Sequence, residues 1–152
     1  ILPIIEELLR DANLRNDNEK IVIKINNKIS DQVFVEADPD RIHQVFNNLI
    51  SNAIRYTDKG QIVINIESKD DRVQFSVIDT GVGINKDSIQ RIFERFYRTQ
   101  NARSRVKSGT GLGLSIVKHI IEAHGANIEV ESEIDKGTTF SFELKKIDEN
   151  IA

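Results

Sequence analysis

The chain has 152 residues, enough for one domain with a substantial core, and its 24 acidic and 21 basic side chains give a net charge of −3. This balance argues against a non-specific nucleic-acid binder, and the absence of cysteine excludes disulfides, thiolate metal sites and a cysteine nucleophile. No apolar run approaches the roughly 20 residues that cross a bilayer, so we expect no membrane contact from this chain. Because no position carries Met, we expect a fragment of a longer protein.

Residues 1–14 carry apolar side chains at helical spacing, which predicts a short amphipathic helix. This helix is either a core element or the junction to an upstream domain. Two strands follow, at 21–26 and 32–37, because both segments are rich in β-branched residues and flank a polar turn.

The segment 38–57 predicts a longer helix, because its apolar residues recur at i, i+3, i+4 and i+7 and Asp38 is a suitable N-cap. A neighbouring stripe carries Asn48, Asn52 and Arg55 at i+4 and i+3 spacing. An isolated Asn usually lies on a solvated helix face. Two amides and a guanidinium in line beside a core face are unusual for a helix that only packs, so we expect function on this stripe.

The segments 61–68 and 72–79 alternate apolar and polar residues and predict a hairpin of half-buried antiparallel strands. The second strand ends at Asp79, and Gly81 and Gly83 allow the backbone to turn sharply and approach a ligand closely. A lone Asp-x-Gly more often caps a turn. At the end of a buried strand, however, a carboxylate can accept a hydrogen bond from an exocyclic amine.

The rest of the chain contains, in order, a short helix or pair of turns at 86–98, a polar basic loop at 98–108, a helix at 112–124, and strands at 126–133 and 138–145. The expected apolar anchors of the first of these segments are Ile89, Ile92, Phe93 and Phe96.

This order of elements predicts an α/β (α+β) two-layer sandwich, with a mixed, mostly antiparallel sheet and helices on one face. It does not fit a doubly wound parallel fold. We expect the domain proper to span 15–147, after the junction helix at 1–14, and the tail 148–152 to fray.

The glycine-rich segment GTGLGL, 109–114, precedes the helix at 112–124. A dinucleotide-binding fingerprint would need a third Gly at 114 and a strand directly before it, and a Walker A loop would need a Lys, so neither fits. A purely structural glycine cluster remains an alternative. Amides at a helix N-terminus bind phosphate, and basic residues precede this one, so we favour a polyphosphate site. The basic residues are Arg98, Arg103, Arg105 and Lys107.

Five segments of the chain match the motifs of one family in their proper order. They are Asn48–Tyr56 (the N box), Asp79–Gly83 (G1), Ile92–Arg98 (F), Gly109–Leu114 (G2) and Gly137–Phe140 (the closing glycine-threonine motif). Together they resemble the catalytic and ATP-binding domain of sensor histidine kinases, most like those paired with OmpR-type response regulators. The resemblance implies the Bergerat fold, also found in DNA gyrase, heat-shock ATPase chaperones and MutL, with a mobile ATP lid at 97–110.

For the phosphate end of the site, the resemblance implies ATP with Mg²⁺. Asn52 would coordinate Mg²⁺ through its side-chain oxygen, and Asn48 would lie at the phosphates. Arg55 stands where the family usually has Lys, and its charge should still reach a phosphate although its geometry differs. Arg98 and Lys107 of the lid would close over the γ-phosphate. Asn48 and Arg98 are the expected catalytic residues.

For the base and sugar, the resemblance implies that Tyr56 lies near the ribose and phosphates and that Asp79 reads the adenine amine. Gly83 and Ile84 would line the base pocket, and Thr138 would support the adenine. The remaining residues expected to bind nucleotide are the glycines and neighbours of the G1 and G2 motifs: Gly81, Gly109, Thr110, Gly111, Leu112, Gly113 and Leu114.

The residue four positions before Asn52 separates a histidine kinase from the ATPases and serine kinases of this fold. Those proteins carry Glu there as a general base, whereas this chain has Asn48, whose amide cannot accept a proton at neutral pH. Transfer of the γ-phosphate to a neutral imidazole needs little activation, so we expect a histidine kinase domain. The alternatives are a nucleotide-binding regulatory module without transfer and a GHKL-type ATPase.

None of the histidines, His43, His119 and His124, lies in the family's phosphoacceptor context, so we expect all three to be surface or structural residues. The resemblance implies as partners the protein's own dimerisation and phosphoacceptor domain and the receiver domain of a response regulator. It also implies a monomeric fragment of a homodimer, in a cytoplasmic part of a membrane-anchored sensor.

Overall fold

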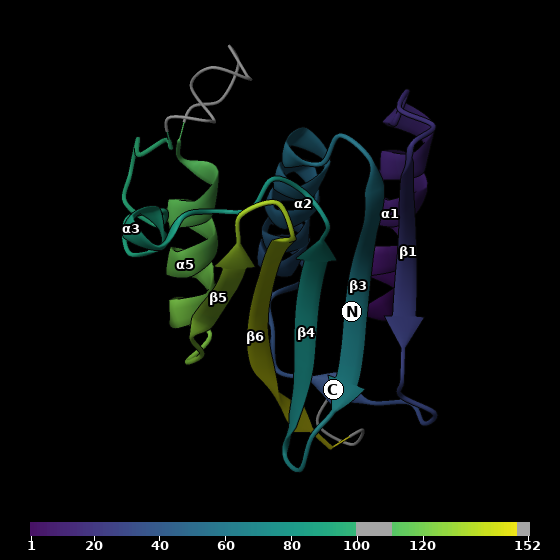
Figure 1. The fold of residues 1–152 in the computed structure, drawn as a ribbon. Helices are drawn as coiled ribbons and strands as arrows, with labels where there is room; N and C mark the ends of the chain where they lie inside the picture. Colours follow the sequence, from purple (N-terminus) through teal and green to yellow (C-terminus); the bar gives the residue numbers. More distant parts are fainter. Residues whose placement is uncertain (100–110, 149–152) are drawn as a thin grey trace.

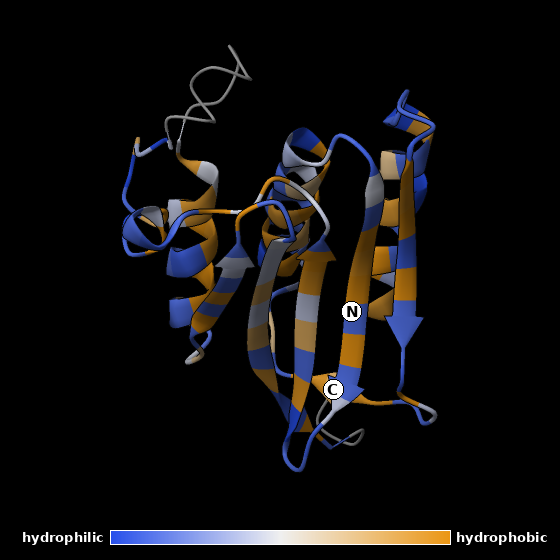
Figure 2. Ribbon diagram, viewed as in Figure 1, coloured by the Kyte–Doolittle hydropathy of each residue, from blue (hydrophilic) through white to orange (hydrophobic). Residues whose placement is uncertain are grey.

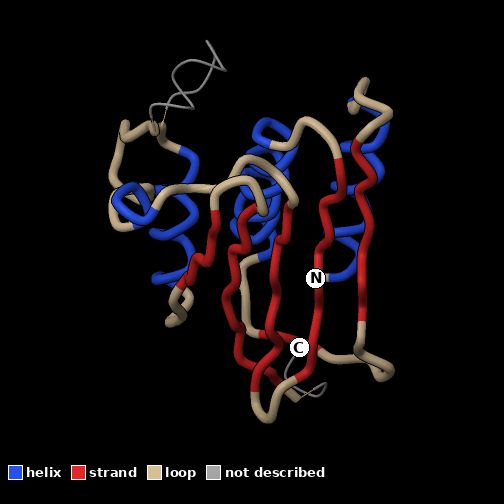
Figure 3. Tube along the Cα trace, viewed as in Figure 1, coloured by secondary structure: helices blue, strands red, loops and turns tan. Residues whose placement is uncertain are grey.

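The computed structural model describes residues 1–99 and 111–148, which form two layers (Figure 1). One layer is a sheet, and the other is a row of helices on one of its faces, as Figure 3 also shows. The helices are α1 (Leu2–Arg15), α2 (Pro39–Tyr56), α3 (Lys86–Ile89) and α5 (Gly113–Ala123). The strands are β1 (Ile21–Asn27), β2 (Phe34–Val35), β3 (Gly60–Ser68), β4 (Arg72–Asp79), β5 (Ile128–Glu133) and β6 (Gly137–Ile147). The predicted two-layer fold with a mixed, mostly antiparallel sheet is confirmed.

The sheet is ordered β1-β3-β4-β6. Strands β1 and β3 run parallel, whereas β4 runs antiparallel to both of its neighbours, β3 and β6. The outer edge of β6 carries β5 along its first residues and β2 at its last two. The hairpin expected from 61–68 and 72–79 is therefore present, and the strands expected at 126–133 and 138–145 also pair with each other.

The second predicted strand is much shorter than 32–37, since only Phe34 and Val35 pair with another strand. It also lies far from its sequence neighbour, because β1 pairs with β3 and β2 pairs with the end of β6. The connection crosses the end of the sheet instead of forming a hairpin. Only two residues of this segment therefore reach a strand that can pair with them.

The core lies between the helices and one face of the sheet, where alternate strand residues are buried. Hydrophobic and hydrophilic residues alternate along these strands (Figure 2). At its centre, the rings of Phe46, Phe75 and Phe142 lie 5.5–5.7 Å apart between centroids. The helix α2 packs between α1 and α5, and α1 buries Ile5, so α1 is an element of the core. The opposite face of the sheet is more polar, and no helix among the described residues covers it.

The helix α2 begins where its sequence predicts, directly after Asp38. The Asp38 carboxylate accepts hydrogen bonds from the amides of Asp40 and Arg41, at 3.0 and 3.2 Å, which satisfies two donors that have no partner within the helix. At the same end, the amide of Asp38 donates to Nε2 of His124, which ends α5. His124 Nδ1 donates in turn to the carbonyl of Ile120 at 2.7 Å, so the imidazole fastens the end of α5 to the start of α2.

The F-box segment departs from its prediction at one anchor. Ile92 is buried, but Phe96 is 68% exposed and has a φ of 63°, so it is not an apolar anchor. Its amide donates to the carbonyl of Gly111 at 2.9 Å, and a Cβ on Gly111 would lie 2.8 Å from the Phe96 carbonyl carbon. In this conformation the backbone of Phe96 contacts Gly111, and the Phe96 ring is exposed to solvent instead of packing into the core. In the parts of the chain that the structure describes, no helix is long and apolar enough to cross a membrane.

Candidate functional site

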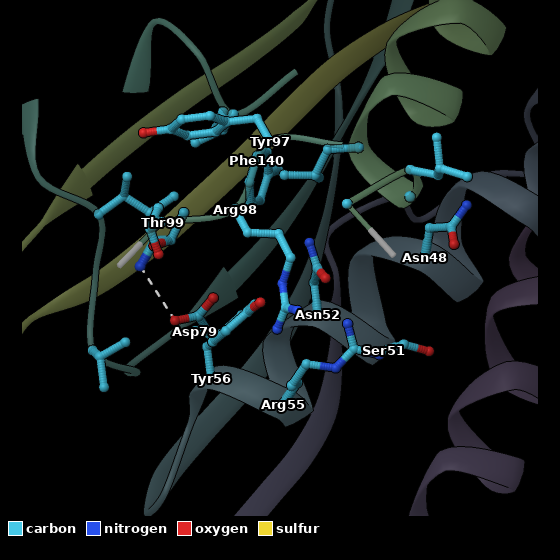
Figure 4. Close-up of a pocket in the computed structure, with 18 of the residues that line it drawn as sticks. Asn48, Ser51, Asn52, Arg55, Tyr56, Asp79, Tyr97, Arg98, Thr99 and Phe140 are labelled. Atoms are coloured by element: carbon cyan, nitrogen blue, oxygen red, sulfur yellow. Dashed lines mark hydrogen bonds between the residues drawn. The ribbon is translucent and has the colours of Figure 1, made fainter. Parts of the chain in front are cut away.

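A cavity of about 460 Å³ opens beside the C-terminal half of α2 (Figure 4). Its walls come from α2, the end of β4 and the loop after it, the F-box segment, the start of α5 and the beginning of β6. The lining residues are Asn48, Ser51, Asn52, Arg55, Tyr56, Asp79, Val82, Gly83, Ile84, Ile92, Tyr97, Arg98, Thr99, Gly111, Leu112, Gly113, Leu114, Ile116, Thr138 and Phe140.

The cavity brings together the predicted site residues from all five motifs. One exception is Gly81, which is buried and does not line the cavity. The others are Lys107, Gly109 and Thr110, which fall outside the described residues. The predicted basic loop at 98–108 and the lid at 97–110 also lie mostly outside the described residues, as does the tail beyond 148.

Asp79 occupies the end of the cavity at the edge of the sheet, and only 8% of the residue is exposed. Its Oδ1 atom accepts hydrogen bonds from the amides of Gly81, at 2.9 Å, and Thr138, at 3.3 Å. Burial raises the pKa of Asp79 above its ordinary value of 3.8, and the two amide bonds oppose that rise. Oδ2 accepts no hydrogen bond from any described residue, so the carboxylate holds its orientation and keeps one acceptor for a ligand.

Glycines permit the close packing behind this carboxylate. A Cβ on Gly81 would lie 2.4 Å from the carbonyl oxygen of Tyr56 and 2.9 Å from Asp79 Oδ1, so any side chain there would displace the carboxylate. Gly83 has a φ of 72°, and its Cβ would lie 2.1 Å from the carbonyl oxygen of Glu133. The loop after β4 therefore lies directly against the end of β5.

The opposite end of the cavity is polar and cationic. Asn48, Asn52 and Arg55 extend from one side of α2, as their spacing predicts. From the facing wall, Arg98 extends toward Asn52 and Tyr56 (Figure 4). Neither Asn side chain makes a hydrogen bond with another described residue, so both amides are available to a ligand. Amides and guanidinium groups together suit a chain of phosphates with a bound cation.

The start of α5 lies close to this cationic end. A Cβ on Gly113, the first residue of α5, would lie 3.4 Å from the side-chain oxygen of Asn48. The amides at the helix N-terminus therefore lie beside the polar stripe of α2, as expected for binding of an anion.

Seven residues that line the cavity were not predicted from the sequence as site residues. The missed residues are Ser51, Val82, Ile92, Tyr97, Thr99, Ile116 and Phe140. Phe140 had a usable signal, because it lies two residues after Thr138 and therefore on the same face of β6. Tyr97 also had a signal, because it belongs to the F-box motif, Ile92–Arg98. Its position is set by contacts within this part of the chain: its hydroxyl bonds to Ser88 Oγ at 3.1 Å, and the guanidinium of Arg91 lies 4.5 Å from its ring centroid.

Comparison with known proteins identifies relatives of this arrangement. The chain is 42% identical to "Sensor histidine kinase WalK" of Bacillus subtilis (strain 168) over 129 residues, 83% of this chain and 21% of that protein. It is 49% identical to "Sensor protein SrrB" of Staphylococcus aureus (strain NCTC 8325 / PS 47) over 110 residues, 72% of this chain and 19% of that protein. The chain thus spans about a fifth of the length of these relatives.

Among solved structures, the catalytic domain of histidine kinase ThkA matches with a TM-score of 0.81 and 34% identity, over 95% of this chain and 91% of that one. Full-length ShkA, solved in complex with AMPPNP, matches with a TM-score of 0.80 and 30% identity, over 95% of this chain and 30% of that one. The family model described as "Histidine kinase-, DNA gyrase B-, and HSP90-like ATPase" matches residues 37–148. The chain belongs to this family of ATP-binding domains.

Proposed function

We propose that the chain is the catalytic domain of a sensor histidine kinase, which binds Mg²⁺-ATP and transfers the γ-phosphate to a histidine outside this chain. The relatives named above and the family to which the chain belongs support the ATP-binding part of this proposal. The choice of reaction depends on the residues around the phosphate end of the cavity.

The observation that carries this choice is the position of Asn48, which lines the cavity one helical turn before Asn52. Among the described lining residues, Asp79 is the only carboxylate and there is no histidine. Asp79 lies at the sheet edge of the cavity and is held there by two amides. Water at the phosphates would therefore lack a general base, whereas a neutral imidazole is a nucleophile that needs none.

The metal assignment is also a proposal. Mg²⁺ takes few protein ligands and commonly keeps water and nucleotide phosphates as the others. Asn52 fits this requirement, because its amide lines the cavity and makes no hydrogen bond with the rest of the described chain. The described residues contain no group of three or more His, Cys, Asp or Glu side chains that could hold a metal without the nucleotide. Bound Mg²⁺ would neutralise charge on the phosphates, while Arg55 and Arg98 orient them.

The partners follow from the same proposal. The phosphoacceptor histidine lies in a dimerisation domain of the longer protein, and the phosphate passes on to a receiver domain of a response regulator. The full protein is a homodimeric sensor anchored in the membrane, with this domain in the cytoplasm. His124 is unsuited as acceptor, because both of its ring nitrogens are engaged in hydrogen bonds that join α5 to α2.

The test is to supply this chain with Mg²⁺-ATP, with and without the phosphoacceptor domain of its own protein, and to measure both acid-labile phosphate on that domain and release of free phosphate. We expect transfer that requires the acceptor histidine, with little ATP turnover by the chain alone. Steady ATP hydrolysis without an acceptor would instead identify an ATPase. Tight ATP binding with neither transfer nor hydrolysis would identify a regulatory nucleotide-binding module.

A further inference from the structure

A row of polar side chains crosses three strands at the base end of the cavity. In the sheet register, Asp79 of β4 lies opposite Thr138 of β6, and Thr138 lies opposite Ser132 of β5. Thr138 and Asp79 line the cavity, whereas Ser132 is one strand further from it. Neither the sequence motifs nor the cavity wall includes Ser132.

Ser132 Oγ lies within hydrogen-bonding distance of three groups. The amide of Ile84 donates to it at 2.7 Å, the carbonyl oxygen of Gly137 lies at 2.9 Å, and the hydroxyl oxygen of Thr138 lies at 2.8 Å. A hydroxyl has one hydrogen to donate and two lone pairs. The Gly137 carbonyl can only accept, so it takes the Ser132 hydrogen, and the Ile84 amide takes one lone pair. All three contacts are satisfied only if Thr138 donates its own hydroxyl hydrogen to the second lone pair of Ser132.

This arrangement leaves Thr138 without a donor for the cavity. Its hydroxyl hydrogen points to Ser132, and its amide hydrogen points to Asp79 Oδ1. The side-chain groups that this row presents to a bound base are therefore Asp79 Oδ2 and the lone pairs of Thr138 Oγ1, which only accept. An amino group on the base finds acceptors there, and a carbonyl group finds no donor.

We propose that Ser132 is a positioning residue that fixes the Thr138 hydroxyl as an acceptor, and so makes this cavity select a purine nucleotide with an amino group over one with a carbonyl group at the same position. The inference rests on the proposed ATP binding and adds the residue that sets its base selectivity. The same oxygen also holds the Ile84 amide, so Ser132 joins the loop after β4 to the row that reads the base.

The test compares the binding of ATP and ITP. In ITP the exocyclic amine of adenine is replaced by a carbonyl, and the neighbouring N1 carries a hydrogen. Dissociation constants are measured by calorimetry for the wild type and for Ser132→Ala, with folding monitored by circular dichroism. Without the acceptor at Ser132, the Thr138 hydroxyl is free to turn its hydrogen into the cavity. We expect the preference for ATP over ITP to fall by about five- to tenfold, the size of one ordinary hydrogen bond.

Matched variants separate this role from a structural one. Ser141→Ala removes a serine from the uncovered face of β6 and should leave the preference unchanged. Ser132→Thr keeps a hydroxyl and should keep the preference. In a Thr138→Val background, Ser132→Ala should change the preference less than twofold, because no hydroxyl remains to be oriented. If Ser132→Ala does not fold, Ser132→Cys, which fills similar space with a weak acceptor, is measured in its place and must also lower the preference.

An unchanged ratio of ATP to ITP affinity in folded Ser132→Ala, or an equal loss of both nucleotides, would overturn the inference while leaving ATP binding in place. A wild-type chain that binds neither nucleotide would overturn the proposed ATP site and the inference with it. A third outcome separates the two proposals. If the chain binds ATP and Ser132→Ala lowers its preference for ATP over ITP as expected, but no phosphate reaches the phosphoacceptor domain, the inference is supported and the proposed kinase activity is refuted.

Discussion

Asp79→Asn is expected to stabilise the nucleotide-free fold at neutral pH and, at the same time, to weaken ATP binding. The substitution keeps the side-chain volume and the Oδ1 acceptor, so the hydrogen bonds from the amides of Gly81 and Thr138 can persist. What changes is the atom at Oδ2, where a charged acceptor becomes an amide donor.

The loss of binding comes from this one atom. In the wild type the adenine amine donates a hydrogen bond to the buried carboxylate. In Asp79→Asn it faces the side-chain NH₂ group instead, so two donors meet and no hydrogen bond forms. We expect ATP binding to weaken by about 1–3 kcal/mol, a factor of roughly 5 to 150 in the dissociation constant. Calorimetric titration with a non-hydrolysable ATP analogue measures this directly.

The gain in stability follows from the raised pKa of Asp79. A carboxyl group whose pKa is higher in the folded than in the unfolded chain stabilises the fold only while it is protonated, and this contribution is lost as the pH rises through the folded pKa. At pH 7 the charged Asp79 therefore costs stability that a neutral Asn does not. The stability advantage of Asp79→Asn should be present at pH 7 and should shrink toward zero as the pH falls through the folded pKa, above 3.8, toward the unfolded one.

Urea unfolding of both proteins without nucleotide, at pH 7 and at several lower pH values, tests this expectation. An Asp79→Asn protein that is less stable than wild type at pH 7 would show that the carboxylate stabilises the fold, contrary to the effect of its burial. Unchanged affinity for the ATP analogue would remove Asp79 from the recognition of the base.

Three further predictions concern other parts of the molecule. Asn52→Ala should leave the fold intact and abolish the dependence of nucleotide binding on Mg²⁺; titrations with and without the metal check this, and a retained dependence would refute the metal role. His124→Ala should lower the free energy of unfolding by about 1 kcal/mol, since the Asp38 amide loses its acceptor, and an unchanged urea midpoint would contradict this. Gly83→Ala should destabilise the fold more than Gly125→Ala, because both glycines have positive φ, but only at Gly83 would the Cβ meet a carbonyl oxygen, 2.1 Å away at the end of β5. Equal changes in Tm for the two glycine variants would show that the carbonyl moves aside at little cost.

Much of this architecture could be predicted because it depends on local patterns. The helix α2 has an apolar face of period 3.6 and a capping Asp38, and the strand hairpins alternate with period 2 between turn residues. The site residues of α2 were equally accessible, since spacing alone puts Asn48, Asn52 and Arg55 on one side of a helix. Neither conclusion needs a contact between distant parts of the chain.

The sequence by itself determined most of the segments that form helices and strands, and it indicated the residues that we propose bind ATP. The tertiary structure decided which strands became neighbours: the parallel pairing of β1 with β3 and the attachment of β2 to β6 follow from closing long loops, which no local pattern encodes. It also decided the polarity of the base end of the cavity. The direction of each hydrogen bond around Ser132 depends on partners 5, 6 and 48 residues away along the chain, and only their final positions fix where the Thr138 hydrogen points.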